Sequence, residues 1–496
     1  MRLLNTKTLE LTTFPRDCPS YAILSHTWGD NEAPFEAFIA RPTWRRALPR
    51  IRKHKYPKVV KACSLARNQG YDWIWIDTCC IDKSSSTELS EAINSMYRYY
   101  EMSGICFAYL VDVEVDTSSR RDEITTSLAR SRWFTRGWTL QELIAPAVVE
   151  FYNKDWAEIG TKVSLSSALE KITSIPDGLF SQAWYQLCAG GMARQSLQLL
   201  SAAQKLSWAA TRETTRAEDI AYCLMGLFDV HMPLLYGEGE AKAFARLQAE
   251  IAKNTNDQSL FAWGAWYDED GFDGTVLCYS LFASHPSCFS GLGIIRTTYG
   301  RLVSILDHWT PPFEMPNDGY LRIKMRVCRN QEYGILGFMD DDHVAFLECD
   351  VHGRTDMAVG MFVKRLEDVN GTKRFIRVTG TVVLPIQDYL YVALALAQPI
   401  SRFTDESHVA GLAAKINGTT GERNWASVTQ EGGGIGAGGY RSHNMQSRPN
   451  TVSPRVCQGV GWRIAAAKED AADERDRLCL VPSAIASWIL IVTSSL

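Results

Sequence analysis

The sequence predicts an α/β fold in which a parallel sheet with helices on both faces is followed by a helical extension and a β-rich domain. Three observations lead to this prediction. Short apolar runs alternate with helical patterns up to about residue 155, residues 160–256 carry helical periodicity with few strand signals, and strand patterns dominate beyond residue 261. A chain that alternates strand and helix is expected to form a parallel sheet covered on both faces.

Four short apolar runs supply the predicted parallel strands. The first ends at a turn that contains Gly29 and Asp30, and the second is bounded by a Cys-rich turn. Runs of this length are too short for helices of their own and are typical of buried parallel strands. They cover residues 21–25, 73–77, 105–111 and 148–152.

Three helical patterns separate these strands. Residues 58–69 place their apolar side chains on one face, and Gly70 follows in the position of a C-terminal cap. Ser85 and Glu88 have the spacing of a capping box at the start of the clearest helical repeat. After a charged loop, a third helix is expected within residues 131–145, at least from residue 139 onward, and Pro146 follows as a stop.

The chain beyond the predicted sheet divides into regions of different character. Residues 321–327 alternate strictly with period two, which indicates a half-buried strand, and 343–351, 357–363 and 375–384 are further strand candidates, so this region is expected to be mostly antiparallel. The predicted domains are residues 1–158 for the α/β domain, 159–262 for the helical extension, 263–400 for the β-rich domain, and 401–496 for a Gly-rich linker and weakly ordered tail.

The composition excludes several classes of protein. Among 496 residues, 52 Lys and Arg stand against 56 Asp and Glu, so no basic field points to nucleic acid. The amino terminus has no continuous apolar segment of the secretory type, and the apolar residues 485–492 are fewer than the roughly 20 that span a bilayer. Thirteen Cys without a Cys-x-x-Cys pair indicate neither a disulfide framework nor a zinc ribbon. We therefore expect a cytoplasmic protein without a membrane span, a metal or a resident cofactor.

Polar and aromatic residues gather in three segments, 25–30, 77–82 and 132–142. The first two follow predicted strands, whose carboxyl ends line the ligand crevice of an open parallel sheet. The third opens a helix that could close over the same crevice. Such a site would suit a charged, aromatic ligand such as a nucleotide, because it combines carboxylates, cations and stacking surfaces. The carboxylates are Asp77, Asp82 and Glu142, the cations are Arg132 and Arg136, and the stacking surfaces are Trp28 and Trp138.

The same residues also have structural explanations. Glu142 lies in the first turn of a helix, where the helix dipole favours acidic residues, and Asp77 could cap a turn. Ser25 and His26 are neighbours in a strand and point to opposite faces, so one of them is expected to face the crevice. Trp28 and Trp138 lie beside turns and are the better candidates for stacking on a ligand. Trp73, Trp75 and Trp133 are expected in the core.

Three segments closely resemble, in order, the signature segments of the fungal heterokaryon-incompatibility (HET) domain. They are Tyr21-Ala-Ile-Leu-Ser-His-Thr-Trp-Gly-Asp30, Trp75-Ile-Asp-Thr-Cys-Cys-Ile-Asp-Lys83 and Arg136-Gly-Trp-Thr-Leu-Gln-Glu-Leu143. A weaker likeness continues through residues 217–226 and 233–239, which look like the stretch that commonly follows this domain. The resemblance implies a fungal source and a role in non-self recognition that ends in programmed cell death.

HET domains are in turn similar to Toll/interleukin-receptor (TIR) domains, which have a flavodoxin-like sheet. Ser131-Arg-Trp-Phe134 before Leu140-Gln-Glu-Leu143 resembles the TIR segment whose glutamate cleaves NAD, although extra residues separate Trp133 from Glu142 here. The resemblance implies Glu142 as the catalytic carboxylate and NAD as the substrate. The substrate-binding candidates are Ser25, His26, Trp28, Asp77, Arg136 and Trp138. The carboxylate would stabilise the oxocarbenium-like state that forms when the nicotinamide–ribose bond breaks.

Two functions follow as alternatives. The first is a cell-death effector whose HET domain consumes NAD. The second is a non-catalytic signalling module that self-associates through the HET domain, in which the same polar residues hold loops together. A third hypothesis gives the β-rich region the role of binding the recognised ligand and relieving inhibition of the HET domain. The incompatibility partner protein is not identified by any of these patterns.

Overall fold

The computed structural model describes residues 1–39, 55–189, 193–198, 200–255 and 257–264, shorter segments between 266 and 385, and 489–492. All of them belong to one of the chain's two compact units, residues 1–396 with 485–496. The Gly-rich linker and tail predicted for 401–496 lie outside the described residues, apart from strand β17, Ile489–Val492.

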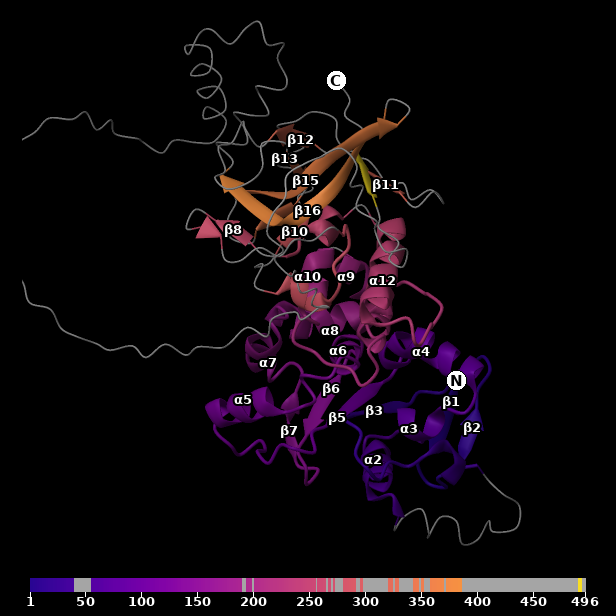
Figure 1. The fold of residues 1–496 in the computed structure, drawn as a ribbon. Coiled ribbons are helices and arrows are strands. Elements are labelled where there is room, and N and C mark those ends of the chain that lie inside the picture. The colour runs from indigo at the N-terminus through magenta and orange to yellow at the C-terminus, as the bar shows by residue number, and fades with distance from the viewer. Residues whose placement is uncertain are drawn as a thin grey trace, which may run out of the picture. The chain divides into compact units, whose positions relative to one another are not determined.

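A seven-stranded mixed sheet forms the amino-terminal part of the chain, and its central strands are parallel (Figure 1). The strands are β1 Arg2–Asn5, β2 Leu11–Thr13, β3 Ala22–His26, β4 Trp73–Trp75, β5 Ile105–Tyr109, β6 Val149–Tyr152 and β7 Glu158–Thr161, in the order β2-β1-β4-β3-β5-β6-β7. Strands β4, β3, β5 and β6 pair in parallel. Their order is that of the first four strands of a flavodoxin-like sheet, so the predicted fold class is confirmed.

The antiparallel edges of this sheet were not predicted. Strands β1 and β2 form a hairpin on one side, and β7 pairs with β6 on the other. These strands are short and partly exposed, so they contain no continuous apolar run that would have marked them in the sequence.

Helices connect the parallel strands on both faces of the sheet. They are α2 Pro57–Asn68, α3 Asp77–Cys80, α4 Ser86–Glu101, α5 Arg121–Arg130 and α6 Thr139–Ile144. Right-handed crossovers place α2 on one face and α4 and α6 on the other. The contacts agree, because α2 packs against β4, whereas α6 packs against β3 and α4.

Helix α4 begins as predicted, with one change in the capping box. The Ser85 hydroxyl accepts the backbone N–H of Glu88 at 3.3 Å. The Glu88 carboxylate instead binds the Arg2 guanidinium at 2.7 Å and the backbone N–H of Asp82 at 2.8 Å. The prediction of a charged loop was wrong where α5 forms, because this helix buries only Ile124 and Leu128 and so shows little periodicity.

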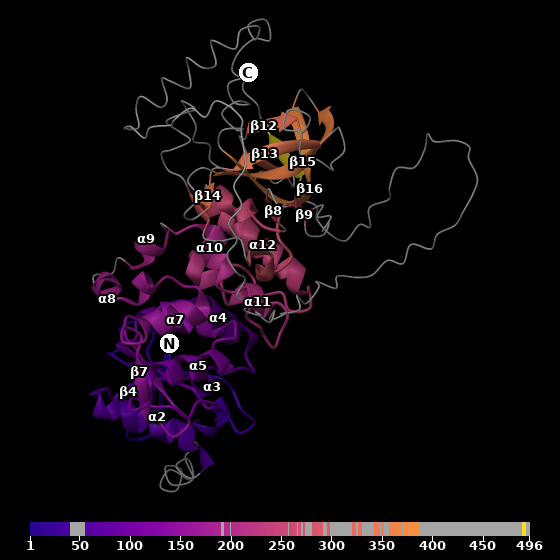
Figure 2. The same ribbon diagram turned by 90° about the vertical axis from the view of Figure 1, so that its left-hand side faces the viewer.

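The elements described between residues 166 and 261 are all helices, and α11 and α12 pack together (Figure 2). They are α7 Ser166–Thr173, η3 Asp177–Phe180, α8 Gln182–Ala189, α9 Ala193–Gln198, α10 Ala202–Ser207, α11 Asp219–Tyr222, η4 Met225–Phe228, α12 Glu240–Asn254 and η5 Gln258–Phe261. No helix in the described part of the chain combines the length and apolar character that a membrane crossing requires.

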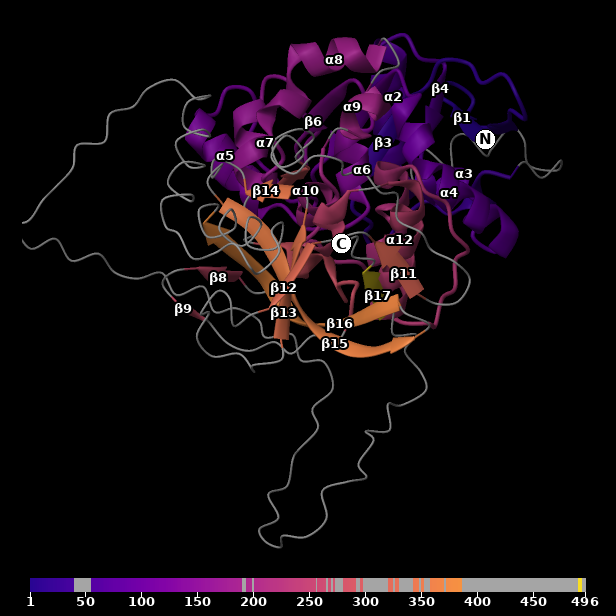
Figure 3. The same ribbon diagram turned by 90° about the horizontal axis from the view of Figure 1, so that it is seen from above.

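The described segments beyond residue 265 are mostly strands, as predicted, and the long hairpin of β15 and β16 is their main feature (Figure 3). The elements are β8 Trp266–Asp268, β9 Gly271–Phe272, η6 Pro286–Phe289, β10 Ile295–Thr297, β11 Tyr320–Ile323, β12 Arg326–Arg329, β13 Asp342–Leu347, β14 Cys349–Val351, β15 Met357–Val369 and β16 Thr372–Pro385. The prediction of one strand over 321–327 was wrong, because β11 and β12 lie at opposite ends of the sheet order.

Candidate functional site

Ser25 and Glu142 meet in the interior, at the carboxyl end of the central strand β3. The Ser25 hydroxyl donates a hydrogen bond to the Glu142 carboxyl and accepts one from the Trp133 indole N–H at 2.8 Å. The Tyr100 hydroxyl of α4 donates to the Leu24 carbonyl oxygen at 3.3 Å and is also hydrogen-bonded to the Glu142 carboxyl. Helix α6 positions Glu142, and all six residues of that helix are buried. The predicted catalytic carboxyl is therefore the centre of a polar network inside the protein.

A second cluster lies around Asp77, which begins the short helix α3 directly after β4. One carboxyl oxygen of Asp77 accepts the Trp28 indole N–H at 2.7 Å. The other lies 3.2 Å from Nε2 of His26, although the pair is not aligned for a hydrogen bond. Trp28 is 50% exposed, and the Lys83 ammonium lies 3.6 Å from its ring centroid. This cluster therefore has an open aromatic surface beside a cation, which can receive an anionic aromatic ligand.

Arginine side chains contribute to the two clusters in different ways. Arg132 binds the Thr27 hydroxyl at 3.0 Å and the Trp28 carbonyl oxygen at 3.4 Å, so it supports the loop after β3. Arg136 donates to the Thr215 hydroxyl of the helical extension at 2.9 Å. The Trp138 indole donates to Asp219 at 3.1 Å. Arg136 and Trp138 are therefore engaged with the extension rather than with Ser25 or Asp77.

Burial controls the ionisation of this site. Burial, together with the nearby charge of Asp77 and against the hydrogen bond from Ser25, raises the pKa of Glu142 to about 8. Burial also raises the pKa of Asp77, against the charge of Lys83. The pKa of His26 is held well below its usual range by burial and then by the charges of Lys58 and Lys83. At neutral pH, Glu142 is therefore mostly protonated and His26 is neutral.

A protonated, desolvated carboxyl can donate a proton or a hydrogen bond, and its anion can stabilise a developing positive charge. Carboxyls with raised pKa values are frequent at functional sites. Glu142 is only 7% exposed, and Ser25 already occupies one of its oxygens. A sugar ring could reach the carboxyl only after the network opens.

Tyr100, Trp133 and Lys83 belong to the two clusters but were not predicted as functional residues. Trp133 was expected in the core, and it is fully buried there, yet its indole N–H binds Ser25. The missed signal was chemical, because a buried tyrosine or tryptophan needs a partner for its polar group. Lys83 ends the second signature segment, and the cations predicted for the site were Arg132 and Arg136 of the third segment instead.

Lys162 stabilises the carboxyl end of α6 from inside the protein. Its ammonium donates to the carbonyl oxygens of Pro146 at 2.5 Å and Leu143 at 3.3 Å, and burial lowers its pKa to about 8. We expect Lys162→Met to lower the free energy of unfolding by about 2 kcal/mol, because these carbonyl groups lose their donor. Denaturant unfolding at pH 7 measures this, with exposed Lys171→Met as the control. Equal midpoints for the two variants would contradict the prediction.

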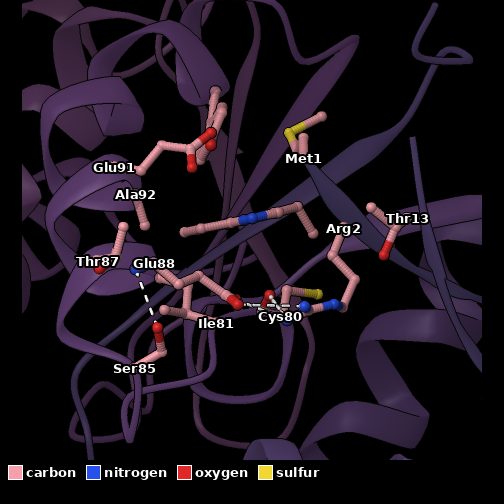
Figure 4. A pocket seen from close by; sticks show the side chains of 12 residues that line it. Met1, Arg2, Thr13, Cys80, Ile81, Ser85, Thr87, Glu88, Glu91 and Ala92 are labelled. Carbon is pink, nitrogen blue, oxygen red and sulfur yellow. Dashed lines mark hydrogen bonds and ion pairs between the residues drawn. The ribbon is translucent and has the colours of Figure 1, made fainter. Parts of the chain in front are cut away.

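Two cavities lie near these elements, and neither is lined by Glu142. The first, of about 280 Å³, is bordered by Trp75, Cys80, Glu91 and the Arg2–Glu88 ion pair (Figure 4). The second, of about 420 Å³, is lined by Arg212, Glu240 and His285. Among the residues that the structure describes, no three His, Cys, Asp or Glu side chains are grouped as a metal site.

Comparison with known proteins identifies the class of this domain. The model of the heterokaryon incompatibility protein (HET) family matches residues 21–122, and that of a domain of unknown function (DUF8212) matches residues 242–276. The α/β domain, with signature segments at its strand ends, is therefore similar to the HET domain over residues 21–122.

The chain is similar to the vegetative incompatibility protein HET-E-1 of Podospora anserina, with 42% identity over 238 residues. The match covers 48% of this chain and 16% of HET-E-1, so the chain spans about a sixth of the length of that relative. The match is also longer than the segment 1–158 predicted for the HET domain, so the similarity extends outside that segment. No solved structure matches the chain.

Proposed function

We propose that this protein is a vegetative incompatibility effector that triggers programmed cell death after non-self recognition, and that its HET domain acts by cleaving NAD. The similarity to a vegetative incompatibility protein supports the biological role. The likeness of residues 131–143 to the TIR segment supports the reaction. In this proposal the protein acts in the cytoplasm, self-associates through the HET domain and responds to an incompatibility partner protein.

The observation that carries the reaction is the Glu142 carboxyl, whose pKa is raised to about 8 at the carboxyl end of β3. In the proposed reaction, the bond between nicotinamide and the ribose C1′ breaks, and its electron pair leaves with neutral nicotinamide. Water adds to C1′, and its proton goes to the ionised form of Glu142, which is the minor form at neutral pH because the pKa is raised to about 8. The exposed Trp28 ring, with Lys83 above it, offers a stacking surface and a cation for the nucleotide.

The burial of Glu142 has a consequence for this proposal. Because the carboxyl is held by Ser25 and Tyr100, the free chain has a closed site. Self-association or partner binding would open it, which would restrict NAD loss to cells that have recognised a partner.

A second candidate function is a scaffold that signals by self-association without catalysis. The same network favours this candidate, because Ser25 of β3 and Tyr100 of α4 hydrogen-bond to Glu142 of α6 and so hold these three elements together. In that case the network keeps α6 against β3 and has no chemical role.

NAD consumption by the full chain separates the two functions. We expect turnover at protein concentrations that allow assembly, and a loss of about 100-fold or more in Glu142→Gln, which keeps the shape of the side chain. Glu150→Gln is the matched control, since Glu150 is a half-buried carboxyl bonded to Tyr152 and lies outside the network. No turnover by the parent, with assembly confirmed by light scattering, would favour the scaffold.

A further inference from the structure

Arg212 is a buried cation of the helical extension that hydrogen-bonds to the turn before α6 and to the first residue of α6. It lies between α10 and α11 and is only 2% exposed. One terminal nitrogen donates to the Arg136 carbonyl oxygen at 2.8 Å and the Thr139 hydroxyl at 3.0 Å, while Nη2 has no hydrogen-bond acceptor among the described residues. Burying a guanidinium is costly unless its interactions compensate. The position therefore calls for a specific role.

A chain of hydrogen bonds connects Arg212 to Glu142. Thr139, which accepts the bond from Arg212, begins α6, and its hydroxyl lies 2.5 Å from the Trp133 carbonyl oxygen. The Trp133 indole binds Ser25, and Ser25 binds Glu142. Arg212 thus contacts the turn that presents Trp133 to the buried carboxyl.

The extension also pairs with the backbone of this turn. The N–H of Glu213 donates to the Thr135 carbonyl oxygen at 2.6 Å, and the N–H of Gly137 donates to the Glu213 carbonyl oxygen at 2.9 Å. A Cβ atom added at Gly137 would lie 2.6 Å from Cγ2 of Thr214. The glycine of the third HET signature segment is therefore what allows the extension to approach so closely.

The charge of Arg212 also acts on the buried carboxyl. Burial lowers the pKa of Arg212 to about 10, while the charges of Cys223 and then Glu142 oppose this shift. Several other ionisable groups surround Glu142. They are Asp77 from α3, Tyr100 from α4, Cys106 from β5 and Arg136 from the turn before α6. Arg136 is the cation among these four groups, and Arg212 adds a second one.

We propose that Arg212 is a positioning residue of the HET site, which fixes the Trp133–Thr139 turn and through it the Ser25–Glu142 pair. The site is then complete only with the extension, and the functional unit is longer than residues 1–158. This inference rests on the proposed function for its catalytic meaning, but the positioning itself can be measured without NAD turnover.

The test compares full-chain Arg212→Gln and Arg212→Lys with Arg216→Gln, an exposed arginine of the same segment. The first measurement is amide hydrogen exchange over residues 132–145. We expect about tenfold faster exchange in Arg212→Gln and a smaller increase in Arg212→Lys, because lysine keeps the charge with fewer donors. The second measurement is the free energy of unfolding as a function of pH, for each variant with and without Glu142→Gln. The midpoint assigned to Glu142 should rise by about one pH unit in Arg212→Gln and return towards the parental value in Arg212→Lys.

Each outcome decides the role of Arg212. If Arg212→Gln behaves like Arg216→Gln in both measurements, the proposal is overturned. If Arg212→Gln speeds exchange but leaves the midpoint unmoved, Arg212 is a structural residue only, and the positioning role is rejected. If the parent consumes no NAD while both shifts occur, the proposed reaction fails and the positioning of Glu142 by Arg212 stands.

Discussion

Replacing Gly226 with alanine is expected to lower the free energy of unfolding by about 3 kcal/mol, because there is no room for a side chain at this position. Gly226 lies in η4, which packs against α4. An added Cβ atom would lie 2.1 Å from Cβ of Tyr97 and 2.6 Å from its Cγ. Rotation of the tyrosine cannot relieve this clash, since Cβ is fixed to the backbone of α4. The helix and the extension would have to separate.

Denaturant unfolding, followed by hydrogen exchange in α4, measures this effect. Gly178→Ala is the matched control, because an added Cβ there meets no atom within 4 Å. The control is expected to keep or slightly raise the stability, since alanine restricts the unfolded chain more than glycine does. Unfolding of Gly226→Ala at the same denaturant concentration as the control would show that η4 does not pack on α4.

The free energy of unfolding is expected to fall as the pH rises from about 5 to 8, and Glu142→Gln should remove much of this fall. A glutamate in the unfolded chain loses its proton near pH 4.3, whereas burial raises the pKa of Glu142 in the folded state to about 8. Between these values the folded state binds more protons than the unfolded state. The stability from this group is therefore full below about pH 4.3 and is lost as the pH rises through about 8.

One titrating group changes the free energy of unfolding by at most about 1.4 kcal/mol per pH unit. Several other buried groups titrate in the folded protein, Asp77 and Lys162 among them. The measurement is therefore the difference between the parent and Glu142→Gln at each pH, with Glu150→Gln as the control. Parallel curves for the parent and Glu142→Gln would mean that Glu142 is already ionised in the folded state.

The parallel strands of the first sheet could be predicted from local patterns, because buried parallel strands leave continuous apolar runs. The start of α4 was predicted for a similar reason, since a serine cap acts on a backbone N–H three residues away. The exposed edge strands and α5 were missed because little of their surface is buried. The apolar pattern of a segment is clearer when more of its surface is buried, so the sequence predicts core elements better than those at the edges.

The candidate site was likewise predictable only in part. The sequence by itself determined which residues stand at the strand ends, and Ser25, Asp77 and Glu142 do lie at the carboxyl ends of β3 and β4 or beside them. It did not determine that Arg136 and Trp138 bind the extension, because their partners Thr215 and Asp219 are distant along the chain.

Only the tertiary structure decided the protonation of Glu142. Its pKa of about 8 is set by desolvation among β3, α4 and α6 and by charges on α3 and before α6. Desolvation and Coulomb interactions depend on distances through space, whereas periodicity and capping act within a few residues of one chain segment. The sequence therefore identified the carboxyl, and the packing of remote segments around it determined its chemical state.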